Sequence, residues 1–138
     1  MIDDIYNTDV IRLAADISRV EPLDSPDAQV SMRAPLCGST IHVELCIKKG
    51  RVSRFGQNIK ACALGQAAAS VLAAHVIGKS AEDILAVRDQ VSDMLADKGP
   101  SPDGDWSALS ALAPAKDAKS RHGAILLPFN AVLKAFAS

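Results

Sequence analysis

The stretch STIHVELCIKK alternates hydrophobic and polar residues over about one strand length. This alternation predicts a β-strand with one buried face and one largely polar face. The next residues, KKGR, are typical of a turn in which Gly50 adopts positive φ. A return strand follows as far as Ile59, and Gly56 within it predicts a β-bulge. This part of the chain is therefore predicted to form a β-hairpin.

On both sides of the hairpin the hydrophobic period changes to that of helices. NTDVIRLAADI predicts a first helix over residues 8–18, with its opening Asn-Thr pair available as an N-cap. The stretch DAQVSMR, before the hairpin, predicts a third strand. The alanine-rich stretch ACALGQAAASVLAAHVIG predicts a helix that begins next to Cys62 and ends before Gly78.

The second half of the chain is predicted to be mainly helical. SAEDILAVRDQVSDMLADKGP predicts a helix that opens with a capping box between Ser80 and Asp83. WSALSAL predicts one or two short helical turns, and Trp106 is expected to fix this loop to the core. SRHGAILLPFNAVLKAF predicts a last helix with a kink at Pro128. The order of elements indicates an α+β fold, in which a small antiparallel sheet of about three strands has helices packed on one face.

Length and composition fit one domain over residues 1–138, because 49% of the residues are hydrophobic and 22% are charged. The net charge of −1 and the aromatic content of 4% argue against nucleic-acid binding. No stretch approaches the roughly 18 consecutive apolar residues of a membrane helix. The acidic start, MIDDIYNTD, lacks the features of a secretory signal, so we expect a cytoplasmic protein.

Three cysteines, Cys37, Cys46 and Cys62, are the clearest candidates for chemistry. An odd number in a reducing compartment argues against a disulfide framework. Cys37 precedes the first strand of the hairpin and Cys62 follows the second, so strand pairing should bring the two thiols to the same open end. Cys62 also precedes a helix, whose N-terminus favours a thiolate. The pattern is consistent with a metal or reactive site, but also with two core cysteines. Cys46 is predicted to be structural.

Residues 33–78 carry a resemblance to a known family. APLCGSTIHVEL, followed by ACALGQAAASVLAAHVIGKSAEDI, is similar to the NifU/IscU-type iron–sulfur cluster assembly scaffolds. That family has a Pro-x-Cys-Gly-Asp turn before a strand, then a cysteine that leads into a helix rich in Ala and Ser, and a Gly-Lys-Ser helix start. The residues that match are Pro35, Cys37, Gly38, Cys62, Ala67, Ala69, Ser70 and the run Gly78-Lys79-Ser80.

Two departures from the family pattern affect the expected site. Ser39 replaces the family's acidic residue after Cys-Gly, and it is a weaker metal ligand. The family's third cysteine, near the start of the last helix, is absent. Depending on where a gap is placed, His122 stands at that position or one residue before it, with Gly123 in the alternative slot. Two cysteines and one histidine are chemically adequate, since imidazole and thiolate both bind Zn²⁺ and iron.

The resemblance implies a scaffold rather than an enzyme. It would bind iron and sulfide through Cys37 and Cys62, with His122 and Ser39 as further candidate ligands. The cargo would be a transient cluster, expected to be [2Fe–2S], built with sulfur from a cysteine desulfurase and passed to apo-proteins. The scaffold is expected to be a monomer or a weak homo-oligomer. Two alternatives stay open: a zinc-binding sulfur-transfer accessory that carries persulfide, and a degenerate homologue that only docks to a partner.

Overall fold

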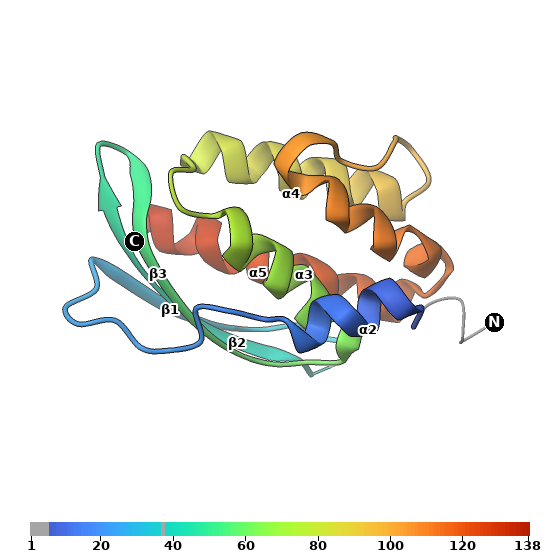
Figure 1. The fold of residues 1–138 in the computed structure, drawn as a ribbon, viewed down its shortest axis with the longest axis horizontal. Helices are drawn as coiled ribbons and strands as arrows, with labels where there is room; N and C mark the ends of the chain where they lie inside the picture. Colours follow the sequence, from blue (N-terminus) through green and yellow to red (C-terminus); the bar gives the residue numbers. More distant parts are fainter. Residues whose placement is uncertain (1–5, 37) are drawn as a thin grey trace.

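The computed structural model describes residues 6–36 and 38–138. A three-stranded antiparallel sheet carries helices on one face (Figure 1). Its strands are β1 (Ala28–Arg33), β2 (Thr40–Lys48) and β3 (Arg51–Lys60), with β2 in the centre. The predicted α+β class, the hairpin and the third strand are therefore confirmed.

The helical elements follow the predicted order with different lengths. They are α2 (Thr8–Ala15), α3 (Ala63–His75), α4 (Ala81–Leu95), the 3₁₀ helices η1 (Gly104–Asp117) and η2 (Lys119–Arg121), and α5 (His122–Ala137). Helix α2 ends before the predicted residue 18, and the short turns predicted near Trp106 are part of the longer η1. Pro128 lies inside α5, which continues beyond it. None of the described helices is both long and apolar enough to cross a membrane.

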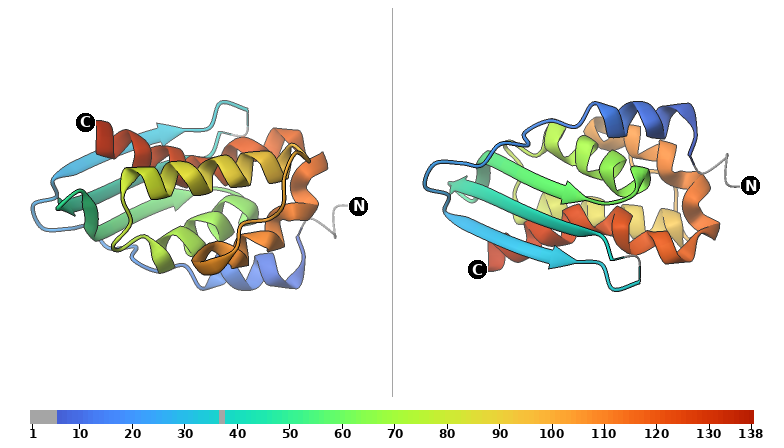
Figure 2. Two further views of the ribbon diagram at one scale, coloured as in Figure 1. Left: turned by 90° about the horizontal axis from the view of Figure 1, so that it is seen from above. Right: turned by 90° about the horizontal axis from the view of Figure 1, so that it is seen from below.

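The hydrophobic core lies between the sheet and the helices. Val43 and Leu45 of the central strand are fully buried, as the alternation of β2 predicted. Helix α5 packs against β1 and β2, α3 packs against α5 and β3, and α4 packs on α5. The opposite face of the sheet is free of helices in the view from below (Figure 2, right). The result is one helix-covered face and one largely polar face.

The prediction of a bulge at Gly56 is wrong, because Gly56 pairs regularly with Glu44 and the register changes instead between Cys46 and Ile47. Gly56 has a different role. Residues 19–25, which we call the strap, cross the sheet there, and a β-carbon at Gly56 would overlap the backbone carbonyl of Glu21. Glycine is therefore required by a contact with a distant segment rather than by the strand itself.

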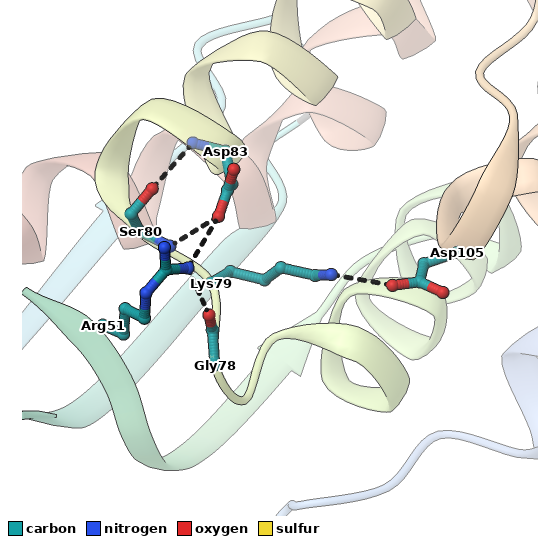
Figure 3. A network of polar contacts seen from close by, with 6 residues as sticks. All are labelled: Arg51, Gly78, Lys79, Ser80, Asp83 and Asp105. Carbon is teal, nitrogen blue, oxygen red and sulfur yellow. Dashed lines mark hydrogen bonds and ion pairs between the residues drawn. The ribbon is translucent and has the colours of Figure 1, made fainter.

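The connection between α3 and α4 is held by polar contacts (Figure 3). The predicted capping box is present, since the Asp83 N–H donates to Ser80 Oγ and the Ser80 N–H donates to Asp83 Oδ2. Arg51 of β3 donates to the Gly78 carbonyl at 2.9 Å and lies 3.4 Å from Asp83. The backbone N–H of Ser80, more than any other group, lowers the pKa of Asp83.

A second contact fixes the start of η1 to the same connection. Lys79 Nζ lies 2.7 Å from Asp105 Oδ2 (Figure 3) and 5.7 Å from the centre of the Trp106 ring. Trp106 itself is buried in the core, as predicted, with its ring edge-on to Phe129 at 6.3 Å. The hydrogen bond from Lys79 lowers the pKa of Asp105.

Candidate metal centre

The first part of the candidate site is the turn between β1 and β2. Arg33 pairs with Thr40, and Thr40 pairs with Lys60, so this turn lies beside the end of β3. Two backbone bonds close the turn: the Ala34 N–H donates to the Ser39 carbonyl at 2.8 Å, and the Gly38 N–H donates to the Ala34 carbonyl at 3.0 Å. Gly38 has a φ of +72°, which favours glycine.

Cys37, the first predicted ligand, lies outside the described residues. Its chain neighbours Leu36 and Gly38 both lie in the turn, and the side chain of Leu36 is 82% exposed. Ser39 is buried, and its carbonyl is one of the two acceptors that close the turn. The backbone of Ser39 therefore has a structural role, and the ligand role of its hydroxyl stays a prediction.

The second part of the site is Cys62, directly after β3. It is the N-cap residue of α3, as the sequence predicted, and its thiol is free and half-buried. The thiol makes no capping hydrogen bond to the helix. A helix N-terminus carries partial positive charge from its unpaired N–H groups, and that charge stabilises a nearby thiolate. Cys62 is thus a free and partly accessible thiol at the start of α3.

The third part is the start of α5. His122 is the first residue of this helix, and its Nε2 lies 2.9 Å from the Ala115 carbonyl oxygen. A carbonyl only accepts hydrogen bonds, so Nε2 carries the hydrogen and the neutral ring has its lone pair on Nδ1. Metal-binding histidines commonly donate their other ring N–H to such a carbonyl, which fixes the ring. The bond to Ala115 therefore leaves Nδ1 outside that contact, and the His122 residue lines a pocket with Leu95 and Asp97 near the end of α4.

Close backbone packing joins these three parts. A β-carbon built on Gly65, in the first turn of α3, would stand 3.1 Å from the carbonyl oxygen of Ala124 in α5. A β-carbon on Gly123 would stand 3.5 Å from the β-carbon of Ala34 in the β1–β2 turn. The starts of α3 and α5 and the turn therefore meet at one end of the sheet. The hairpin predicted this for the turn and the start of α3.

The roles of Gly65 and Ala115 were missed by sequence reasoning. Gly65 had a signal, because a glycine inside a helical pattern often marks a close approach of two backbones. No sequence signal marked Ala115, because its backbone carbonyl is what contacts His122, seven residues further along the chain.

The remaining cysteine and histidines lie in other surroundings. Cys46 is buried, and its thiol lies 3.8 Å from the Ser25 carbonyl. His42 contacts Ser31 and Glu44, and His75 lies edge-on to Trp106 at 5.9 Å. Within residues 6–36 and 38–138, no three His, Cys, Asp or Glu side chains form a metal-binding group. The predicted set includes Cys37, which lies outside this part of the chain.

The chain is similar to known proteins of one family. Residues 5–120 match the family model described as the NifU-like N terminal domain. The crystal structure of a nitrogen-fixing NifU-like protein (N-terminal) from Brucella abortus is 41% identical, covers 99% of this chain and 94% of its own, and superposes with a TM-score of 0.94. The comparison with curated proteins gives no significant match.

Two more distant structures share the fold. A hypothetical protein is 22% identical, with a TM-score of 0.85 over 99% of both chains. A putative iron–sulfur cluster assembly scaffold protein for the SUF system of Fervidobacterium islandicum is 15% identical, with a TM-score of 0.86 over 97% of this chain and 98% of its own. The family model spans most of the chain, and the Brucella structure matches nearly all of it. The protein therefore belongs to the NifU-like N-terminal domain family.

Proposed function

We propose that the protein is an iron–sulfur cluster assembly scaffold that holds its cargo between Cys37, Cys62 and His122. The observation that carries the proposal is the placement of Cys62 at the N-cap of α3, beside the start of α5 where His122 lies. Membership of the NifU-like family supports it. The chemistry needs reduced thiols, which suits the cytoplasmic location expected from the sequence.

Each proposed ligand has a distinct role. Cys62 would bind iron through its thiolate, at the N-cap of α3. His122 offers Nδ1, while its bond to Ala115 holds the ring in place. Three protein ligands leave coordination positions for sulfide, and a half-buried thiol leaves the cargo accessible to an acceptor. A site of this kind suits transfer better than permanent storage.

The exposed turn supplies a surface for partners. Leu36, the chain neighbour of Cys37, is 82% exposed in this turn. We propose that a cysteine desulfurase delivers sulfur over this turn, and that apo-proteins collect the cluster there. In such a short-lived complex, the partner would bury the exposed side chain of Leu36.

A second candidate function is a zinc-binding accessory that carries persulfide. The lack of a third cysteine favours it, because two thiolates and one imidazole with an open position make a common zinc ligand set. In that function Cys37 or Cys62 accepts the sulfur and Zn²⁺ organises the site. No cluster would form, so the two functions differ in what the protein binds.

Anaerobic reconstitution followed by transfer separates these functions. The protein is incubated with ferrous iron and sulfide, desalted, analysed for iron, sulfide and zinc, and then mixed with an apo-ferredoxin. A scaffold shows visible charge-transfer absorption from the bound cluster and transfers the cluster to the apo-ferredoxin. A colourless protein that retains one zinc supports the accessory function and contradicts the scaffold. A protein that binds neither metal contradicts both and leaves the docking homologue.

A further inference from the structure

The outer face of the sheet, opposite the helices, carries a chain of three polar side chains. The register pairs Ser31 of β1 directly with His42 of β2, and Glu44 lies two residues further along the same face of β2. Ser31 Oγ lies 2.8 Å from His42 Nδ1. His42 Nε2 lies 2.9 Å from Glu44 Oε2. A hydroxyl, an imidazole and a carboxylate are thus connected in series.

The positions of the hydrogens in this chain follow from Glu44. Its other oxygen, Oε1, accepts the Leu23 N–H of the strap at 2.9 Å. That bond, followed by the one with His42, lowers the pKa of Glu44, which keeps it ionised at neutral pH. An ionised carboxylate only accepts hydrogen bonds, so the hydrogen lies on Nε2 of His42. The lone pair of the neutral ring is then on Nδ1, where it accepts the hydroxyl hydrogen of Ser31.

We propose that Ser31 is a nucleophilic serine that accepts small acyl groups from activated esters and thioesters, with His42 as its general base. In this step Oγ forms a bond to the acyl carbonyl carbon, and the hydroxyl proton passes to His42 Nδ1. The carbon–sulfur or carbon–oxygen bond of the donor breaks, and the departing thiolate or phenolate takes the proton from His42. Glu44 is a positioning residue, since it fixes the tautomer of His42 without touching the donor. Ser31 is exposed, so a donor can reach it.

The surroundings favour a lasting modification over repeated turnover. Backbone N–H groups of β2 bond to β1 and β3, so this strand offers no pair of free donors for an oxyanion. Loss of such a donor costs about 10²- to 10³-fold in rate. General-base assistance still contributes about 10²- to 10⁴-fold. The serine ester that forms has a poorer leaving group than a thioester or aryl ester, so its hydrolysis is the slower step.

Labelling with p-nitrophenyl acetate tests the proposal on the intact protein. Peptide mapping by mass spectrometry locates the acetyl group, and hydroxylamine removes serine esters but not lysine amides. We expect Ser31 to be acetylated at least tenfold faster than the exposed serines Ser107 and Ser110. His42→Gln should reduce the rate at Ser31 at least tenfold, with an unchanged circular dichroism spectrum. Equal labelling of the three serines, or a rate unaffected by His42→Gln, would overturn the proposal.

The positioning role of Glu44 is tested by the tautomer of the His42 ring, which a loss of stability alone would not change. Nitrogen NMR of the His42 ring reports which nitrogen carries the hydrogen. We expect the Nε2–H form in the wild type and a mixture of forms in Glu44→Ala. An unchanged tautomer in that variant would contradict the positioning role. Ser31→Ala should keep full iron and sulfide binding, so failure of this proposal is distinguishable from failure of the scaffold proposal.

Discussion

Gly65 in the first turn of α3 lies against Ala124 in the first turn of α5, with no room for a side chain between them. A β-carbon at Gly65 would stand 2.8 Å from the β-carbon of Ala61 and 3.3 Å from that of Ala124. These two helix starts carry Cys62 and His122. The contact therefore sets how closely two of the three proposed ligands approach each other.

Gly65→Ala should destabilise the protein and weaken metal binding. A new methyl group in a closely packed contact costs about 1–3 kcal/mol, which outweighs the gain in helix propensity. Urea unfolding measures the loss. Gly123→Ala is the matched control, because its β-carbon would meet Ala34 at an ordinary 3.5 Å. Equal stability of the two variants would show that the contact is not tight.

Gly56→Ala should release the strap. The added β-carbon would overlap the Glu21 carbonyl, so the strap must move away from β3 and lose the bond from the Gln57 N–H to the Arg19 carbonyl. We expect a loss of about 1–3 kcal/mol in unfolding free energy and faster hydrogen exchange. The exchange increase should be confined to residues 19–25 and their contacts. Hydrogen exchange of residues 19–25 at the wild-type rate in the variant would contradict this role of Gly56.

Glu44→Gln should change the acid limb of the stability curve. The folded protein holds the pKa of Glu44 below the ordinary 4.5, because Leu23 and His42 donate to its ionised form. This contribution to stability is therefore fully present above about pH 4.5 and is lost as the pH falls through the folded pKa. The difference in unfolding free energy between wild type and variant should shrink on acidification from pH 6 to pH 3. A difference that stays constant over this range would show that Glu44 is not stabilised as a carboxylate.

Ser80→Ala should cost about 1 kcal/mol, because it removes the hydroxyl that accepts the Asp83 N–H at the start of α4. Thermal or urea unfolding against Ser107→Ala, an exposed serine in η1, measures this cost. Equal stability of the two variants would show that the capping box does not contribute.

The sequence predicted most of what depends on local pattern. The alternation of β2, the turn at Gly50 and the alanine-rich α3 are each encoded within one segment, so their prediction needed no tertiary information. Gly56 was misinterpreted because glycine is required there by contact with the strap, which lies more than thirty residues earlier in the chain. The length of η1 was missed, since a 3₁₀ helix of fourteen residues is uncommon and has no strong hydrophobic period.

The places of Cys62 and His122 in the fold were predicted, whereas their role as ligands stays a prediction. Pairing at the open end of the hairpin was sufficient to place Cys62 beside the turn that contains Leu36 and Gly38. The position of His122 at the start of α5 followed from the family pattern. Its bond to Ala115, and with it the choice of Nδ1, depends on how η1 folds back onto α5. That contact joins two helices, and the sequence of neither helix predicts it.

The most direct test of the central claim is the visible absorption of the reconstituted protein, measured for wild type, Cys62→Ala and Cys46→Ala under the same anaerobic conditions. Cys46 is the matched control, because its thiol is buried beside the strap. We expect a charge-transfer band of similar strength in wild type and Cys46→Ala, and its loss in Cys62→Ala. A band that persists in folded Cys62→Ala would contradict the assignment of Cys62 as a ligand of the cluster.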